Sequence, residues 1–207
     1  MNALPATGTS GQRARPTPGP GDALLVVDVQ NDFLPGGKLS VRGGNEVIPI
    51  LNRIIAAFGR LDLPIYASRD WHPSDHCSFR TEGGPWPPHC IAGLHGAEPP
   101  AALQLPEETH VVYKGTSPYA DAYSAFQATG LGVELRRSGC RRVFIGGLAT
   151  DYCVRATALD ALRNGLDAVV FEDAVRPVDV HDGDGARALE ELRAAGATVT
   201  DSKSLVG

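Results

Sequence analysis

Short apolar runs alternate with segments of helical periodicity from residue 22 onward, and this alternation limits the fold more than any other feature. The first run, ALLVVDV at 23–29, is apolar almost throughout, as is typical of a strand buried on both faces. Further strands are predicted at 64–70, 109–115, 141–147, 166–173 and 197–201, and helices at 45–61, within 123–139, at 150–165 and at 185–196. This order predicts a three-layer α/β/α fold with a mainly parallel central sheet.

The chain length sets the number of domains. Its 207 residues are enough for one α/β domain and too few for two full ones, so we expect a single domain over 22–207. Residues 1–21 are rich in Pro, Gly, Thr and Ala and lack a periodic apolar pattern. Such a segment buries too little apolar surface to fold, and we expect a disordered tail.

The charge and the cysteines narrow the class of protein. A net charge of −5 without a basic run argues against a nucleic-acid partner. No apolar stretch is long enough to cross a bilayer, and the N-terminus lacks the apolar core of a signal peptide, so no membrane partner is expected. The four cysteines form no C-x-x-C pair, which favours reduced thiols in a cytoplasmic protein.

Reactive side chains stand at the ends of four successive predicted strands. Asp28, Asp70 and Lys114 end the first three, and Cys153 follows the fourth. In open parallel sheets, ligands bind beyond the carboxyl ends of the strands. We therefore expect these four side chains to converge at one edge of the sheet.

Cys153 falls in the first turn of a predicted helix, directly after a strand. A free cysteine is most often a small buried apolar residue. A helix N-terminus, however, lowers the pKa of a thiol, and its N–H groups can hold an oxyanion. Asp28 could then act as a base and Lys114 could hold developing negative charge. Alternatively, Asp28 is a surface aspartate or a helix cap, and Lys114 is an ordinary solvated lysine.

The long segment from Asp70 to Glu108 breaks the strand–helix rhythm and holds a cluster of metal-ligand residue types. Asp70 and His72 are two residues apart and can face the same way in extended backbone, while His76 and His89 follow. An aspartate with two or three histidines suits zinc, iron(II) or manganese. A single histidine is more often structural.

Aromatic residues near these positions either pack the core or form a slot for a planar ring: Phe33, Trp86, Tyr119 and Tyr123.

The chain resembles the nicotinamidases, also known for activating pyrazinamide, within the isochorismatase-like hydrolase superfamily. The resemblance covers about 22–201 and rests on VVDVQNDFLPGG, RDWHPSDHCSF, WPPHCIAGLHGAE, YKG, AYSAF and GLATDYCVRATALDALRNG. The Asp-x-His and WPPHC pieces point to the metal-containing nicotinamidases, because isochorismatases and carbamoylsarcosine amidases generally lack them.

The resemblance implies roles for individual residues. Those implied for catalysis are Asp28, Lys114 and Cys153. Those implied as ligands of one divalent metal ion are Asp70, His72 and His89, with His76 a ligand in some members only. A cis peptide is implied between Leu148 and Ala149, with the backbone N–H groups of Ala149 and Cys153 as an oxyanion hole. Those implied for holding the substrate ring are Phe33, Trp86 and Tyr123.

The function implied is hydrolysis of nicotinamide to nicotinate and ammonia through a cysteine thioester, in NAD salvage. One alternative is a metal-independent amidohydrolase of the same superfamily acting on a carbamoyl or ureido substrate. A second is a metallohydrolase in which zinc activates water and Cys153 is incidental. A third is a binding protein that kept the fold without the activity. The sequence leaves open whether the chain forms a homo-oligomer.

Overall fold

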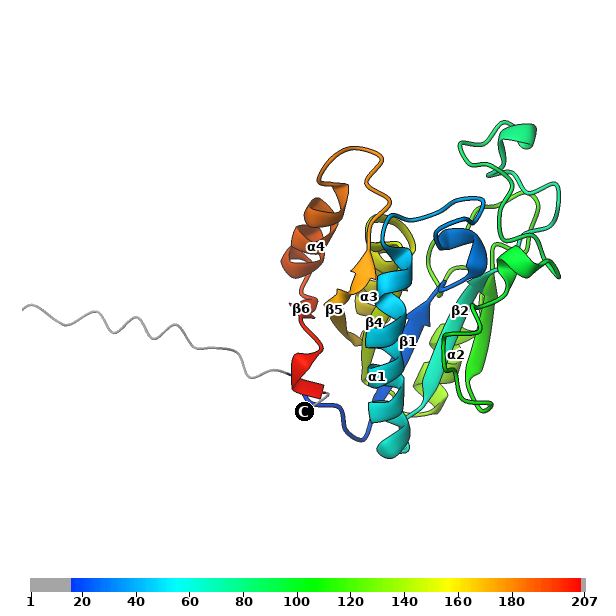
Figure 1. Cartoon of the computed structure of the whole chain (residues 1–207). Helices are drawn as coiled ribbons and strands as arrows, with labels where there is room; N and C mark the ends of the chain where they lie inside the picture. The colour runs from blue at the N-terminus through cyan, green and yellow to red at the C-terminus, as the bar shows by residue number, and fades with distance from the viewer. Residues whose placement is uncertain (1–15, 206–207) are drawn as a thin grey trace, which may run out of the picture.

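The computed structural model describes residues 16–205 and contains one six-stranded sheet between two layers of helices (Figure 1). The strand order is β3-β2-β1-β4-β5-β6, and every neighbouring pair is parallel. The expected α/β/α architecture is confirmed. The strands are β1 (Asp22–Val27), β2 (Ile65–Asp70), β3 (His110–Lys114), β4 (Arg142–Leu148), β5 (Asp167–Arg176) and β6 (Thr198–Thr200).

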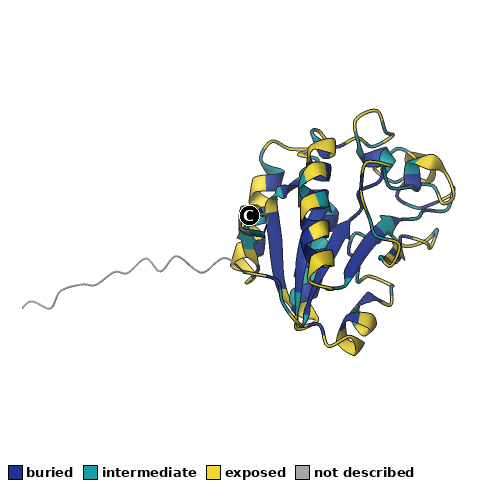
Figure 2. Ribbon diagram, turned by 60° about the horizontal axis from the view of Figure 1, so that its bottom comes forward, coloured by how far each residue is buried: buried dark blue, intermediate teal, exposed yellow. Residues whose placement is uncertain are grey.

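The helices cover the two faces of the sheet unequally. Helix α1 (Val47–Arg60) lies in front of the sheet in Figure 1 and buries Leu51, Ile54 and Phe58 in the hydrophobic cluster on that face. The cluster on the other face includes residues from α2 (Leu131–Arg137), α3 (Arg155–Arg163) and α4 (Asp184–Ala194). The central strands β1, β2 and β4 are therefore buried on both sides, and the exposed residues lie mostly on helices and loops (Figure 2). This explains why β1 reads as a continuous apolar run.

The order of the strands creates a crevice between β1 and β4. Strand β1 pairs with β2 on one side and with β4 on the other, so successive strands lead away from this point in opposite directions. Open α/β sheets bind ligands at such a switch point. Gly147 near the end of β4 has φ +130°, and a Cβ there would overlap the carbonyl oxygen of Val27 in β1. Only glycine allows β4 to approach β1 this closely.

The segment between β2 and β3 is a long loop, as expected. It holds two short 3₁₀ turns, η3 (Arg80–Glu82) and η4 (His95–Ala97), and isolated bridges that join His72 to Ile91 and Phe79 to Trp86. These contacts fold the loop back on itself above the carboxyl ends of the strands (Figure 1). The fold thus places the histidines of this segment over the sheet edge.

The expected N-terminal tail falls partly outside the described residues, which begin at 16. Within the described part, Arg142 donates to the carbonyl oxygen of Thr17 (3.0 Å), and Arg141 donates to that of Pro20 (2.9 Å). Residues that precede the expected domain boundary at residue 22 are therefore hydrogen-bonded to the start of β4.

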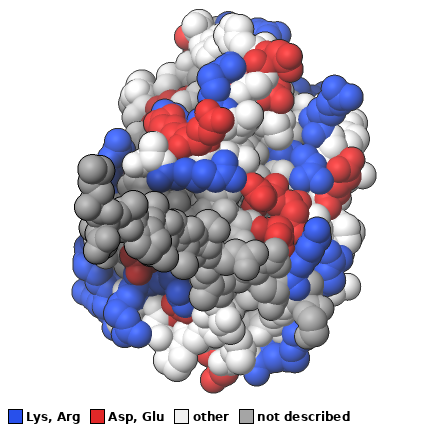
Figure 3. All heavy atoms as spheres, turned by 90° about the vertical axis from the view of Figure 1, so that its left-hand side faces the viewer, with Lys and Arg blue, Asp and Glu red and all other residues white. Residues whose placement is uncertain are grey.

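The surface on the left of Figure 1, which carries α4, mixes both signs of charge (Figure 3). Arg155 pairs with Glu191 at 2.7 Å, and Arg193 with Glu172 at 2.8 Å. The described residues visible on this face form no extended patch of one sign. Within residues 16–205, no helix is long and apolar enough to span a bilayer.

Candidate active site

Asp28 lies directly after β1 and is fully buried. The hydroxyl of Ser68 donates to its Oδ1 at 2.6 Å, and its Oδ2 lies 2.9 Å from the ammonium of Lys114. Burial raises the pKa of Asp28, although the charge of Lys114 acts in the opposite direction. A buried carboxylate with a raised pKa can both accept and return a proton near neutral pH.

Lys114, the last residue of β3, is buried at the centre of the site. Its Nζ contacts both carboxylates, Asp28 Oδ2 and Asp70 Oδ1, and donates to the carbonyl oxygen of Ala122 at 2.9 Å. The Sγ of Cys153 lies 3.5 Å away. Burial alone would lower the pKa of Lys114, but Asp28 and Asp70 outweigh it, and the pKa is raised well above its ordinary value. Lys114 is therefore a buried, charged residue and not a solvated one.

Cys153 lies in a π-helical turn, η5 (Thr150–Val154), between β4 and α3. Its thiol is buried, and its Sγ lies within 4.8 Å of a carboxylate oxygen of Asp28. The expected lowering of its pKa is wrong: burial raises the pKa well above its ordinary value, and Lys114 offsets only part of this. The resting sulfur is thus a neutral thiol beside a carboxylate.

The turn after β4 brings Ala149 to the same cavity as Cys153. The peptide bond between Leu148 and Ala149 is cis, as the resemblance implied. The carbonyl oxygen of Ala149 accepts from the N–H groups of Tyr152 (3.2 Å) and Val154 (3.0 Å), which closes the turn around Cys153.

Asp70, His72 and His89 form a second group beside these residues. One ligand atom from each lies within 4.8 Å of those of the other two, and all three residues are buried. The Nδ1 of His72 lies 2.9 Å from the carbonyl oxygen of Gly115, and the Nδ1 of His89 lies 2.8 Å from that of Pro87. A carbonyl only accepts, so in the neutral ring each Nδ1 carries the proton and Nε2 keeps a lone pair. Against the effect of burial, the neighbouring Asp70 carboxylate raises the pKa of His72 and so favours a second proton on that ring. Two imidazole nitrogens and one carboxylate oxygen fit a zinc-type ion.

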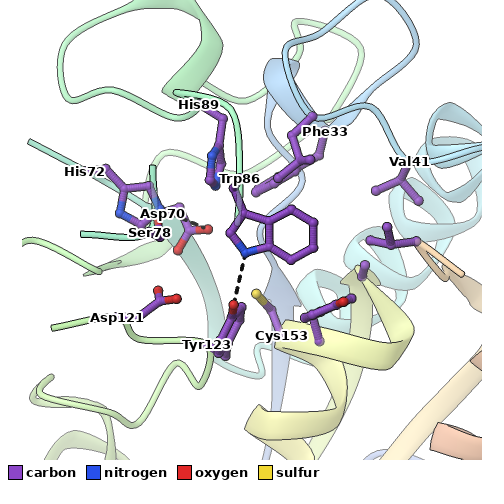
Figure 4. A pocket seen from close by; sticks show the side chains of 14 residues that line it. Phe33, Val41, Asp70, His72, Ser78, Trp86, His89, Asp121, Tyr123 and Cys153 are labelled. Atoms are coloured by element: carbon purple, nitrogen blue, oxygen red, sulfur yellow. Dashed lines mark hydrogen bonds and ion pairs between the residues drawn. The ribbon is translucent and has the colours of Figure 1, made fainter. Parts of the chain in front are cut away.

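A cavity joins the two groups (Figure 4). It encloses about 460 Å³ of space, counting its open mouth. In Figure 4, Asp70, His72, Ser78 and Asp121 lie on one side, Val41 lies on the other, and the Cys153 sulfur lies between them. The remaining lining residues are Phe33, Leu39, Trp86, His89, Tyr123, Ala149, Tyr152 and Val178.

Two aromatic side chains meet across this cavity. The indole N–H of Trp86 donates to the hydroxyl of Tyr123 at 3.0 Å, and both rings lie against Tyr152 at centroid distances of 5.2 and 5.6 Å. Phe33 lines the cavity from the loop after β1 and contacts the ring of His89. Tyr119, in contrast, is 92% exposed and does not line the cavity.

Comparisons with known proteins agree with this geometry. Residues 22–204 match the model of the isochorismatase domain. The chain belongs to the isochorismatase family. A nicotinamidase of Acinetobacter baylyi is 37% identical over 89% of this chain and 94% of its own. The pyrazinamidase of Pyrococcus horikoshii, solved in complex with zinc, superposes with a TM-score of 0.84 at 46% identity, covering 88% of this chain and 99% of its own. PnC1 from L. infantum, solved in complex with nicotinate, superposes with a TM-score of 0.83 at 40% identity, covering 89% and 94%.

His76 is not part of the group that Asp70, His72 and His89 form in this isochorismatase-family site, although it contacts His72. Its Nδ1 lies 2.7 Å from the hydroxyl of Ser78, and its Nε2 lies 3.3 Å from the carbonyl oxygen of Ala120. Its ring stacks on His72 with centroids 4.0 Å apart. Both nitrogens of His76 thus have protein partners, and its ring packs against the ring of His72.

Several residues of the site could not be predicted from the sequence of this family member. Gln30 is fully buried, and its side-chain amide accepts from the N–H of Asp70 (2.9 Å) and donates to the carbonyl oxygen of Asp70 (2.7 Å). Ser68 likewise donates to Asp28, and Asp121 lines the cavity. Polar residues of these types are common in loops and at strand ends, so only their positions in the folded chain distinguish them.

Proposed function

We propose that this isochorismatase-family enzyme is a nicotinamidase, which hydrolyses nicotinamide to nicotinate and ammonia. The observation that carries the proposal is the convergence of Asp28, Lys114 and Cys153 beside a cavity that also exposes the Asp70, His72 and His89 group. The names of the relatives support the same activity.

The first half of the reaction forms a thioester. Asp28 accepts the proton of the Cys153 thiol, which lies beside it, and the sulfur attacks the carboxamide carbon. The N–H groups of Ala149 and Cys153 stabilise the resulting oxyanion, each contributing about 3 kcal/mol. Asp28 then returns its proton to the amide nitrogen, the C–N bond breaks and ammonia leaves.

The second half consumes one water. Asp28 takes a proton from the water as its oxygen attacks the thioester carbon, and the oxyanion forms again at the same N–H groups. The C–S bond breaks, Asp28 returns the proton to sulfur, and the carboxylic acid loses its own proton to solvent and leaves as nicotinate. Lys114 keeps its charge throughout, since two carboxylates surround it, and so favours the negative charge that moves between Asp28 and Cys153.

The pyridine ring occupies the cavity between aromatic side chains in this proposal. Phe33, Trp86 and Tyr123 provide the flat apolar surfaces. Asp70, His72 and His89 would hold one divalent transition ion, zinc, iron or manganese. Such an ion, when bound, supplies an anchor for the ring nitrogen, either directly or through its water. His76 would support His72 without being a ligand.

The deciding experiment measures ammonia release. Wild-type protein should release ammonia from nicotinamide, whereas Cys153→Ser should fold normally and lose at least a thousandfold in kcat. Cys140→Ser is the matched control, because Cys140 is also buried but lies outside the cavity. Turnover of a carbamoyl or ureido amide and not of nicotinamide would favour the metal-independent alternative. Substantial turnover by Cys153→Ser would favour a water-activating metal centre.

The proposal places the enzyme in NAD salvage and in the cytoplasm. All four cysteines are free in the structure, as suits a reducing compartment.

A further inference from the structure

Asp151 fastens a wall of the cavity to the turn that carries Cys153. Its Oδ1 accepts from the backbone N–H of Val178 at 2.9 Å, and its Oδ2 accepts from the N–H of Asp179 at 2.9 Å. Asp151 belongs to η5, two residues before Cys153. A single carboxylate thus holds two consecutive amides of the loop between β5 and α4.

The other end of that loop is fastened to α4. The carboxylate of Asp179 accepts from the N–H of Gly185 at 2.8 Å. Gly185 is buried, and a Cβ at this position would overlap Pro177. The loop is therefore held on both sides, and Asp151 makes the connection on the side that faces the cavity.

Val178 is the residue of this loop that reaches the cavity. It lines the cavity together with Leu39 and Val41, and it packs against the hydrophobic cluster of the α1 face. Figure 4 shows Val41 on the side opposite to Asp70 and His72. We refer to Leu39, Val41 and Val178 as the apolar wall.

We propose that Asp151 is a positioning residue that fixes Val178 in the apolar wall, and that this wall sets which ring substituents the substrate can carry. The inference rests on the proposed function. In nicotinamide the two ring positions meta to the amide are the nitrogen and C5. A nitrogen turned toward Asp70, His72 and His89 leaves C5 turned toward the apolar wall. A methyl group on C5 would then meet Val178, whereas the amide would reach Cys153 unchanged.

The test compares kcat/KM for nicotinamide and 5-methylnicotinamide in the full chain. Wild type should prefer nicotinamide. Asp151→Ala and Val178→Ala should each reduce that preference by about tenfold, the usual effect of one methyl group in an apolar pocket. The double variant should change it no more than the larger single change, because both substitutions release the same wall. Asp151→Asn, which keeps one acceptor oxygen, should fall between Asp151→Ala and wild type.

Asp173→Ala is the matched control. The carboxylate of Asp173 also accepts from a backbone N–H, that of Ser202 (2.9 Å), and from its hydroxyl (2.7 Å), but neither residue lines the cavity. This variant should leave the preference unchanged. Equal losses on both substrates in Asp151→Ala would overturn the proposal, since Asp151 would then only support the Cys153 turn. A wild type without preference would also overturn it.

Amide hydrogen exchange tests the clamp without any turnover. Asp151→Ala should lose protection at the amides of Val178 and Asp179, and Asp173→Ala should not. Unchanged protection in Asp151→Ala would overturn the inference. If wild type released no ammonia from nicotinamide, the proposed function would fail, and the exchange measurement would still decide the clamp.

Discussion

Lys114 carries a positive charge at a point where two buried carboxylates meet. Its Nζ contacts Asp28 and Asp70, and all three side chains are buried. Removing one partner of a buried charge group leaves the others uncompensated, which costs far more than the loss of a surface ion pair. The same contact links the residues around Cys153 to the Asp70, His72 and His89 group, so one lysine serves both halves of the site.

We therefore expect Lys114→Met to lower the free energy of unfolding by about 3–5 kcal/mol. Urea denaturation would measure this, with Lys38→Met as the control because Lys38 is exposed. The control should stay within about 0.5 kcal/mol of wild type. A Lys114→Met protein as stable as wild type would mean that Asp28 and Asp70 do not share the charge of this lysine.

Residue types at the strand ends could be predicted from the sequence, but their protonation could not. Asp28, Lys114 and Cys153 stand out because polar residues end apolar runs. The pKa of Cys153, however, depends on how completely the folded chain buries it. The helix N-terminus suggested a lowered value, and burial raises it instead. Local sequence carries no information on that burial.

At the scale of elements, strands buried on both faces were the easiest to predict. The predicted strand at 166–173 is too short, because β5 continues to Arg176, which pairs with Leu148 beyond an irregularity in the ladder. The π-helical turn of η5 had no signature, since its residues also suit the first turn of an α-helix. The extension of β5 depends on its pairing with β4, and such tertiary pairing overrides local preference.

The end of β2 and the loop between β2 and β3 supply the residues that are expected to bind a metal ion. The protein should bind about one divalent transition ion per chain, and replacing Asp70, His72 or His89 by Ala should remove it. His76→Ala should retain the ion, because both nitrogens of His76 have protein partners. Elemental analysis of the purified variants measures this. His181→Ala is the control, since the His181 side chain is 83% exposed. Loss of the ion in His76→Ala would contradict this expectation.

At the scale of the whole molecule, the site depends on segments that are distant in the sequence. Asp28 follows β1, Lys114 ends β3, and Cys153 follows β4, yet the parallel sheet brings their carboxyl-end positions together. The switch point between β1 and β4 could be expected for a fold of this class. The contacts of Gln30 and Asp151 could not, because they join loops whose relative position only the folded chain defines.

The cavity as a whole should select substrates that carry a ring nitrogen. Benzamide has the shape and the reactive amide of nicotinamide but no ring nitrogen, so it would leave the Asp70, His72 and His89 group without a partner. Sites built around a polar partner reject an analogue that lacks it far more strongly than apolar pockets reject a missing methylene. We expect kcat/KM for benzamide to be about a hundredfold below that for nicotinamide. The difference should shrink in His72→Ala, in which both amides lose the anchor, and it should persist in His181→Ala. Equal rates on both amides in wild type would show that the ring nitrogen is not read, and the substrate would then belong to the carbamoyl or ureido class.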